Sequence, residues 1–249
     1  MSVLRDYSDR YESVSFTRAD NGVLTMTLHT RGGPLVWGVT PHRELPEAFA
    51  DVAADRENRV VVLTGTGERF CADRDDTLGA LRASAAGWDR IYWEGKRLLS
   101  NLLDIEVPIV AAVNGPALYH AELALLSDVV IAADTTIFQD RPHFASGVVP
   151  GDGVHVVWQK LLGMNRGRYF LLTGQELSAK DALDLGVVNE IMPAAEVLDR
   201  ARQLADGFAQ QTTMTLRYTR VAMTEHIKRA VAEGLGYGLA LEGLALQDD

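Results

Sequence analysis

Two side chains with complementary chemistry lie nine residues apart in the segment FQDRPHFASGVVPGDG, which spans residues 138–153. His143 follows a proline in an irregular stretch, and Asp152 lies in the tight turn PGDG. A carboxylate that contacts an imidazole raises its basicity, so this pair is able to activate a water molecule. A simpler interpretation makes Asp152 the cap of the helix after Gly153, which stabilises a helix by about 1 kcal/mol. The spacing leaves both interpretations open.

Four more residues are weaker candidates. His120 follows the turn NGPALY, where an imidazole is able to donate to a developing oxyanion or return a proton to a carbanion. A structural cap is the simpler role for His120, and the residues alone favour it. Trp37, in PLVWG, offers an indole N–H donor, although a loop tryptophan more often serves packing. His42 and Glu242 are further candidates for substrate binding, and Glu242 also fits a carboxylate on a helix surface.

No metal or cofactor site is predicted. Two histidines and one aspartate are able to serve as metal ligands, but their spacing matches no compact ligand motif. The GTG that follows RVVVLT is not a phosphate-binding loop, because the lysine and serine of such loops are missing.

An α/β core must position these side chains. Apolar runs at 23–28, 59–64, 109–113 and 129–133 are typical of strands, and their alternation with helical segments implies a largely parallel sheet. Thr40 with Pro41 predicts a helix start, and the glycines at 151 and 153 open a helix towards Leu162. From Ala194 the pattern predicts three successive helices. We therefore divide the chain into a core, residues 1–193, and a helical C-terminal region, residues 194–249.

The composition narrows the class of protein. The 249 residues are 47% hydrophobic and 23% charged, which is an ordinary globular balance. The single cysteine excludes an intramolecular disulfide and suits a reducing compartment. No apolar run approaches the roughly 20 residues that span a bilayer. The net charge of −10 argues against a nucleic-acid partner. We expect a cytoplasmic protein with neither a membrane nor a nucleic acid as partner.

An ordered set of motifs resembles the crotonase superfamily. The set begins with IEVPIVAAVNGPAL and SDVVIAAD, and it continues through TIFQDRPHF, GVVPGDG and LLTGQELSAKDALDLGVVNEI. The resemblance implies a crotonase-like spiral of ββα units with a helical C-terminal trimerisation region. It also implies that the chain assembles as a homotrimer or as a dimer of trimers.

The chain departs from the hydratases of this superfamily at three points. Their glycine triplet is replaced by Tyr-His-Ala before Glu122, and their Pro-Glu dipeptide reads Pro142-His143. Their Phe-Ser-Ala-Gly-x-Asp loop reads FCADRD, whose added acidic groups suit a coenzyme A phosphate poorly. With these departures the chain resembles the β-diketone hydrolase branch, which shares the stretches LVW, HAE, FQDxPHF, VPGDG and NRGRYFLLTGQEL. The residues implicated in that branch match Trp37, His42, His120, His143, Asp152 and Glu242.

The resemblance to this branch implies a retro-Claisen hydrolase that needs neither a metal nor an organic cofactor. Water activated by His143 and Asp152 adds to one carbonyl of a cyclic or bicyclic 1,3-diketone, and the C–C bond breaks to give a keto acid. Trp37 and His120 are the candidate donors to the enolate. One alternative is a coenzyme A-dependent enoyl-CoA hydratase or isomerase that uses Glu122. Another is a non-catalytic RNA-binding scaffold, which the negative charge disfavours.

Overall fold

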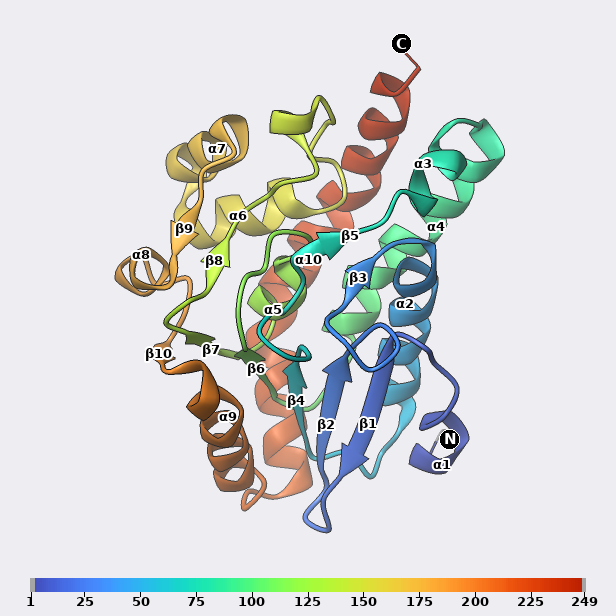
Figure 1. The fold of residues 1–249 in the computed structure, drawn as a ribbon. Coiled ribbons are helices and arrows are strands. Elements are labelled where there is room, and N and C mark those ends of the chain that lie inside the picture. Colours follow the sequence, from blue (N-terminus) through green and yellow to red (C-terminus); the bar gives the residue numbers. More distant parts are fainter. Residues whose placement is uncertain (1–2, 248–249) are drawn as a thin grey trace.

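The computed structural model describes residues 3–247 and is built around one six-stranded sheet (Figure 1). In spatial order its strands are β1 (Val14–Arg18), β2 (Val23–Leu28), β4 (Val60–Thr64), β6 (Ile109–Val113), β7 (Val129–Ala133) and β10 (Glu190–Met192). β1 runs antiparallel to β2, and every other neighbouring pair in this sheet is parallel. The predicted α/β architecture with a largely parallel sheet is confirmed.

A row of very short strands lies beside the large sheet. These strands are β3 (Val36–Trp37), β5 (Asp73–Arg74), β8 (Ile137–Phe138) and β9 (Leu177–Ser178). β3 pairs with β5 and β8 with β9, while single bridges join Ala117 to Cys71 on one side and to Phe138 on the other. The chain passes from β2 to β3, from β4 to β5, from β6 to Ala117 and from β7 to β8. Each turn therefore adds one position to the sheet and one to the row, which is the predicted spiral.

Helices surround the sheet. They are α1 (Leu4–Tyr7), α2 (Val39–Ala54), α3 (Thr77–Arg82), α4 (Ala85–Leu103), α5 (Glu122–Leu125), α6 (Val154–Leu162), α7 (Met164–Thr173), α8 (Ala179–Asp184), α9 (Ala194–Phe208) and α10 (Thr213–Ala245), with a 3-10 turn η1 (Phe144–Ser146). Within residues 3–247, no helix combines the length and the apolar character that a membrane crossing requires.

Both faces of the sheet are buried, which explains the continuous apolar runs of its strands. In β4, Val60 and Val62 belong to a cluster that includes the inner face of α9. Val61 and Leu63 face the opposite way, into the larger core that contains residues of α2 and α4. Complete burial of one such side chain contributes about 1.5–3 kcal/mol. Figure 1 shows α9 on one side of the sheet and α2 with α4 on the other.

Helix α2 begins earlier than predicted. Its first residue is Val39, and its N-cap is Gly38, so Thr40 is not the cap. The hydroxyl of Thr77, at the start of α3, accepts a hydrogen bond of 2.9 Å from the Val39 N–H. A distant side chain therefore satisfies the first turn of α2, and the sequence pattern around Pro41 does not reveal it.

The C-terminal region contains two helices in the described residues, so the prediction of three is wrong. α10 alone spans 33 residues, and the Thr212 hydroxyl caps its start by accepting a hydrogen bond from the Thr215 N–H. The helix continues through Gly238 and Gly243, although glycine costs about 1 kcal/mol in a helix interior. A Cβ at Gly238 would collide with the Gly151 carbonyl, so close packing compensates for the lost propensity.

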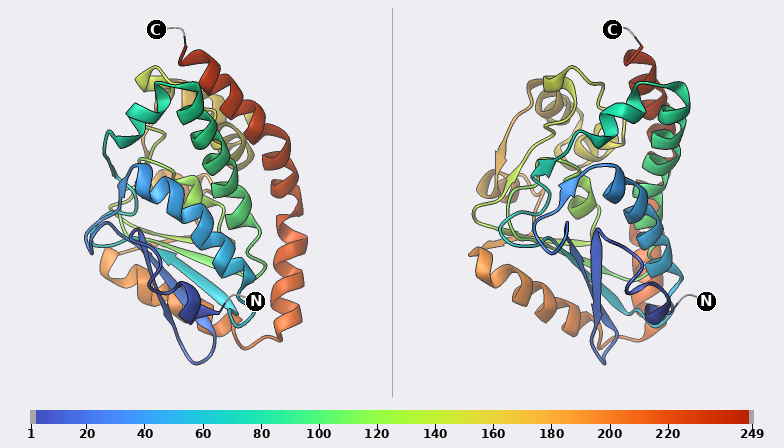
Figure 2. Two further views of the ribbon diagram at one scale, coloured as in Figure 1. Left: turned by 90° about the vertical axis from the view of Figure 1, so that its right-hand side faces the viewer. Right: turned by 45° about the vertical axis from the view of Figure 1, so that its right-hand side comes forward.

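The two C-terminal helices have different neighbours. α9 packs on β4, β6 and β7, and α10 runs along α4 and α6 at the side of the molecule (Figure 2). The division of the chain at residue 193 and the trimerisation role of the region after it stay predictions.

Candidate active site

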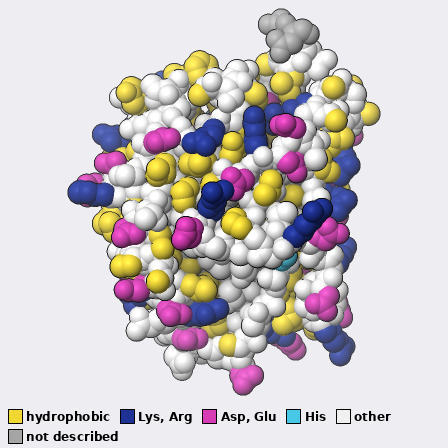
Figure 3. Space-filling model, viewed as in Figure 1, with side chains coloured by type: hydrophobic (Ala, Val, Ile, Leu, Met, Phe, Trp, Pro, Cys, Tyr) yellow, Lys and Arg dark blue, Asp and Glu magenta, His cyan; other side chains and the backbone are white. Residues whose placement is uncertain are grey.

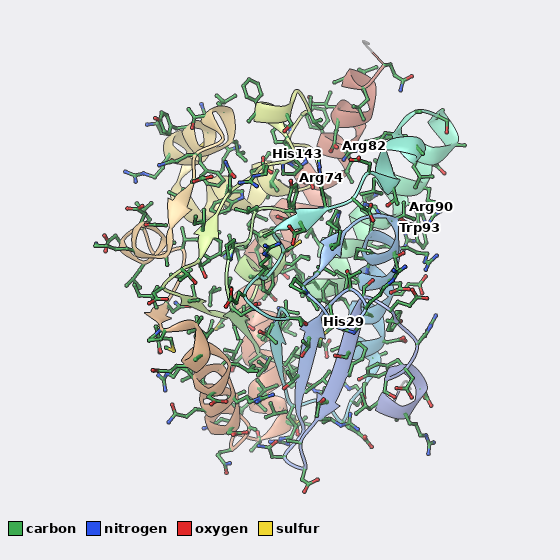
Figure 4. The ribbon with its side chains drawn as sticks, viewed as in Figure 1. His29, Arg74, Arg82, Arg90, Trp93 and His143 are labelled. Carbon is green, nitrogen blue, oxygen red and sulfur yellow. The ribbon has the colours of Figure 1, made fainter. Side chains whose placement is uncertain are left out.

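The residues selected from the sequence meet around one cavity of about 140 Å³. Trp37 ends β3, His120 lies in the loop after β6, His143 follows β8, and Asp152 precedes α6. All four line the cavity, although they come from segments far apart in the sequence. Figure 4 shows His143 at the same end of the molecule as Arg74, which also lines the cavity.

A smaller hollow of about 30 Å³ lies beside the cavity. It shares Trp37, His120 and Asp152 with the cavity, and His42 and Glu242 contribute to its wall. The structure thus brings together all six residues that the sequence singled out. Their catalytic and binding roles stay predictions.

His143 lies between two carboxylates. Its Nδ1 is 2.6 Å from Oδ1 of Asp140, and its Nε2 is 3.4 Å from Oδ2 of Asp152. The predicted contact with Asp152 is therefore present, but the shorter contact is with Asp140, which was not among the predicted residues. His143 and Asp140 are both buried, three residues apart in the same loop. That spacing within FQDRPHF was the signal for the second carboxylate.

These contacts determine which protonation states of His143 and Asp152 are favoured. Burial alone lowers the pKa of His143, but the charge of Asp152 and the hydrogen bond to Asp140 outweigh it and hold the pKa well above the ordinary value. Burial opposes ionisation of Asp152, but His143 and His120 outweigh it and hold the pKa of this carboxyl well below its usual range. These contacts favour the cationic form of the histidine in the resting state. It becomes a base only after it releases a proton.

His120 has an unusual backbone conformation and a carboxylate partner. Its φ of 47° is in the left-handed region that few residues other than glycine adopt. Its Nδ1 is 2.7 Å from Oε1 of the buried Glu122 and 3.7 Å from Oδ2 of Asp152. Burial lowers the pKa of His120, but the charge of Glu122 outweighs it and raises the pKa above the ordinary value. His120 is not a helix cap, because Ala121 occupies the N-cap position of α5.

Trp37 connects the two histidines that lie on either side of it. Its ring centroid is 3.8 Å from that of His120 and 6.1 Å from that of His42. The Nδ1 of His42 is 2.7 Å from Oε2 of Glu94, and Arg90 donates to the other oxygen of this carboxylate. Burial lowers the pKa of His42. Glu94 lies on α4, and its distance in sequence from His42 explains why it was not predicted.

Glu242 reaches the site from α10. It is buried, and one of its oxygens has no hydrogen-bond partner among residues 3–247. Burial and the nearby charge of Asp152 raise the pKa of Glu242 to about 7. The alternative of a carboxylate on a helix surface is therefore wrong. Glycines at close approaches bring the helix near enough, since a Cβ at Gly243 would collide with the Trp88 indole.

One group of side chains offers ligand atoms for a cation. Atoms of His120, Glu122 and Asp152 all lie within 4.8 Å of one another. This set combines an imidazole with two carboxylates, which suits several divalent metals. The imidazole–carboxylate hydrogen bond within the set accounts for the same closeness without a metal. The prediction of a metal-free site stays a prediction.

The sequence and the fold both match known proteins. The family model described as enoyl-CoA hydratase/isomerase matches residues 18–242. The chain therefore belongs to the enoyl-CoA hydratase/isomerase family, within the crotonase superfamily, and the predicted superfamily and fold are confirmed.

Within this family the chain is similar to one hydrolase in particular. A solved β-diketone hydrolase from the cyanobacterium Anabaena sp. PCC 7120, with (S)-3-oxocyclohexyl acetic acid bound, is 50% identical, with a TM-score of 0.95 over 98% of this chain and 97% of that one. A solved enoyl-CoA hydratase/isomerase from Mycobacterium paratuberculosis is 27% identical, with a TM-score of 0.87 over 96% and 95% of the two chains. A carnitinyl-CoA dehydratase from Proteus mirabilis is 35% identical over 76% of this chain and 70% of its own length.

Proposed function

We propose that the chain is a β-diketone hydrolase that cleaves a C–C bond of a cyclic or bicyclic 1,3-diketone without a cofactor. The observation that carries the proposal is His143 between Asp140 and Asp152 at the cavity wall. The likeness to a β-diketone hydrolase over almost the whole chain supports it.

The ligand bound by that hydrolase indicates a substrate class. It is a keto acid, in which an acetic acid side chain is attached to a cyclohexanone ring. Joining its carboxyl carbon to the free α-carbon across the ring, with loss of water, gives a bicyclic diketone with both carbonyls on one bridgehead carbon. We extend this class to the present chain, including the camphor-type diketone 6-oxocamphor.

The first step is the addition of water to one carbonyl. Neutral His143 takes a proton from water at Nε2, and the oxygen of water bonds to the carbonyl carbon. Asp140 supports this step because it accepts the hydrogen bond from Nδ1 and leaves Nε2 directed towards Asp152. The imidazolium that forms is stabilised by both carboxylates, which is the form that their charges favour.

The second step breaks the bond between the attacked carbon and the bridgehead carbon. The electron pair passes to the other carbonyl oxygen as an enolate, and a proton then returns to carbon. The attacked carbon becomes a carboxylic acid, which ionises. His120 and the Trp37 indole are the candidate donors to the enolate, and a preorganised donor of this kind lowers the barrier by about 3–4 kcal/mol. Glu122 favours this role because its charge raises the pKa of His120 and so favours the cationic form.

A substrate panel tests the proposal. Cyclic and bicyclic 1,3-diketones are incubated with wild type, His143→Ala and Asp152→Asn in the absence of coenzyme A. We expect wild type to consume a bicyclic diketone and to release a keto acid, and we expect both variants to lose at least about 100-fold in kcat/KM. Equal turnover in either variant would remove that residue from the mechanism.

A second candidate is a coenzyme A-dependent hydratase or isomerase that uses Glu122. The 35% identity with a carnitinyl-CoA dehydratase favours it. The same panel therefore includes crotonyl-CoA. Turnover of the thioester with no reaction of any diketone would replace the first proposal with the second.

We also propose that the chain forms a homotrimer or a dimer of trimers, and that neither nucleic acid nor membrane is a partner. Exposed apolar side chains on α10 support self-association, notably Met214, Tyr218, Met223 and Leu244. On the face shown in Figure 3, acidic and basic side chains are intermixed, without a continuous basic area. Light scattering after size exclusion would determine the mass of the assembly, and retention on RNA at varied salt would test the second part.

A further inference from the structure

Two guanidinium groups line the same cavity as His143 and Asp152. Arg74, in β5, lies at the exposed side of the cavity, and Arg82, at the end of α3, is partly buried. Figure 4 shows both near His143 at one end of the molecule. Neither has a role in the water-addition or enolate steps described above.

Arg82 is incompletely satisfied. Its Nε is buried and has no hydrogen-bond partner among residues 3–247. Its Nη2 is 3.9 Å from Oε1 of Glu242, which is longer than a hydrogen bond. A buried donor without a partner costs about 1–3 kcal/mol, and more when the group is charged. A bound anion would supply the missing acceptor.

The guanidinium of Arg74 is also available to bind an anion. Its guanidinium lies 5.8 Å from the centroid of the Tyr119 ring, and within residues 3–247 it forms no ion pair. Two carboxylates at this wall, Asp75 and Asp76, are exposed to solvent, where water and salt screen their charge. One oxygen of Asp75 already accepts hydrogen bonds from the backbone and the hydroxyl of Thr77.

The inner wall, in contrast, carries charges of both signs. Asp152 is ionised and lies against the imidazoles of His143 and His120. Positive charge on these rings partly offsets the negative charge of the carboxylate. These charges are engaged with one another, whereas the buried Nε of Arg82 has no hydrogen-bond partner among the described residues. Arg82 and Arg74 therefore offer an anion the less compensated positive charge of this cavity.

We propose that Arg82, with Arg74 beside it, forms a subsite for the carboxylate of a small keto acid. This inference rests on the proposed function, in which a neutral diketone becomes an anion within the cavity. The new carboxylate moves away from Asp152 and pairs with Arg82, which orients the product and makes it an inhibitor of the next turnover. Arginine suits this role because its planar fork matches a carboxylate. Glu242 lies beyond hydrogen-bond distance of Arg82 and leaves its donors available for this pair.

Direct binding tests the subsite without turnover. Calorimetry with the full chain compares (S)-3-oxocyclohexyl acetic acid with its uncharged primary amide. We expect wild type to bind the acid at least about 10-fold more tightly than the amide, which is the scale of one charge-assisted hydrogen bond. Arg82→Gln should abolish this preference, Arg82→Lys should keep part of it, and Arg74→Gln should reduce it less.

The matched control is Arg56→Gln, which removes an exposed arginine that pairs with Glu106 outside the cavity. It should bind both ligands like wild type. Equal affinity of wild type for acid and amide, or an unchanged preference in Arg82→Gln, would overturn the subsite. Preferential binding of the acid in a chain that cleaves no diketone would support the subsite and reject the proposed function. Cleavage of a diketone by a chain that shows no preference for the acid would support the proposed function and reject the subsite.

Discussion

Replacement of Asp140 by asparagine tests the carboxylate that the structure adds to the site. Asparagine keeps an oxygen that accepts a hydrogen bond from Nδ1 of His143, so the ring keeps its orientation. The negative charge at 2.6 Å is lost. The variant therefore separates the electrostatic part of this contact from its geometric part.

The expected effect has two components with opposite signs at neutral pH. Asp140 helps to raise the pKa of His143, so its removal lowers that pKa and increases the fraction of neutral histidine. The imidazolium formed in the water-addition step also loses stabilisation. A hydrogen bond to a charged group contributes about 1.5–3 kcal/mol, which corresponds to about 10- to 150-fold in rate. That loss is measurable where His143 is fully deprotonated, on the alkaline plateau.

The assay is a pH profile of kcat/KM for a bicyclic diketone. Wild type should show activity that rises with pH through a pKa well above 6.5, because the resting histidine is protonated. In Asp140→Asn the rising limb should move to lower pH, and the plateau should fall by about 10- to 150-fold. Asp140→Ala should fall further, because it also removes the acceptor for Nδ1.

The control is Asp55→Asn. Asp55 is a buried carboxylate just after α2, and it accepts hydrogen bonds from Tyr7 and Arg18. This variant should lose stability without moving the rising limb. A limb at the same pH in Asp140→Asn and wild type, with an unchanged plateau, would refute the assignment of His143 as a base held by Asp140.

The same ion pair predicts how stability depends on pH. His143 has a folded-state pKa above its unfolded value of about 6.5. The contribution of His143 to the free energy of unfolding is therefore fully present below pH 6.5. It is lost as the pH rises through the raised pKa of the folded state. Urea denaturation above pH 6.5 should show wild type losing more stability with rising pH than Asp140→Asn.

Four further variants test packing and charges in the site and elsewhere in the fold. Burial holds the pKa of Glu242 in the folded state above its unfolded value, so the stability of wild type should decline as the pH rises from 4.5 to about 7. Glu242→Gln should remove this decline, which urea denaturation at pH 5 and pH 8 measures. Arg220→Met should destabilise the fold by about 3–5 kcal/mol, because it leaves the Asp128 carboxylate without its buried partner; a loss within about 1 kcal/mol would contradict this. Gly243→Ala should lower the free energy of unfolding by about 1–3 kcal/mol, because the added Cβ collides with the Trp88 indole. Gly207→Ala, with open space around the added Cβ, should leave the stability unchanged or raise it by up to about 1 kcal/mol. Thermal unfolding measures both.

Much of the sheet was predictable from the sequence. The strands at β2, β4, β6 and β7 have bounds that agree with the apolar runs to within one residue. Both faces of these strands are buried, so the run itself carries the information. The short strands such as β3 were not predicted, because two residues contain no detectable period. The number of C-terminal helices was wrong, because the glycines of α10 are retained for packing and do not end the helix.

The chemical identity of the site was also predictable to a large extent. The motif around His143 and Asp152 and its likeness to a family selected six residues, and the structure brings them together. The side chains that pair with these residues were harder to predict from the sequence. Asp140 was three residues away and still passed over, and Glu94 contacts His42 from another helix.

The sequence by itself determined which side chains were candidates for the site: three histidines, a tryptophan and the carboxylates of Asp152 and Glu242. Only the tertiary structure decided that His143 lies between two anions, that Glu242 is buried beside Asp152, and that Arg82 faces the same cavity. The physical reason is that periodicity along a chain depends on neighbours in sequence. A pKa or an ion pair depends instead on burial and on charges within a few ångströms, and packing brings those charges from distant segments.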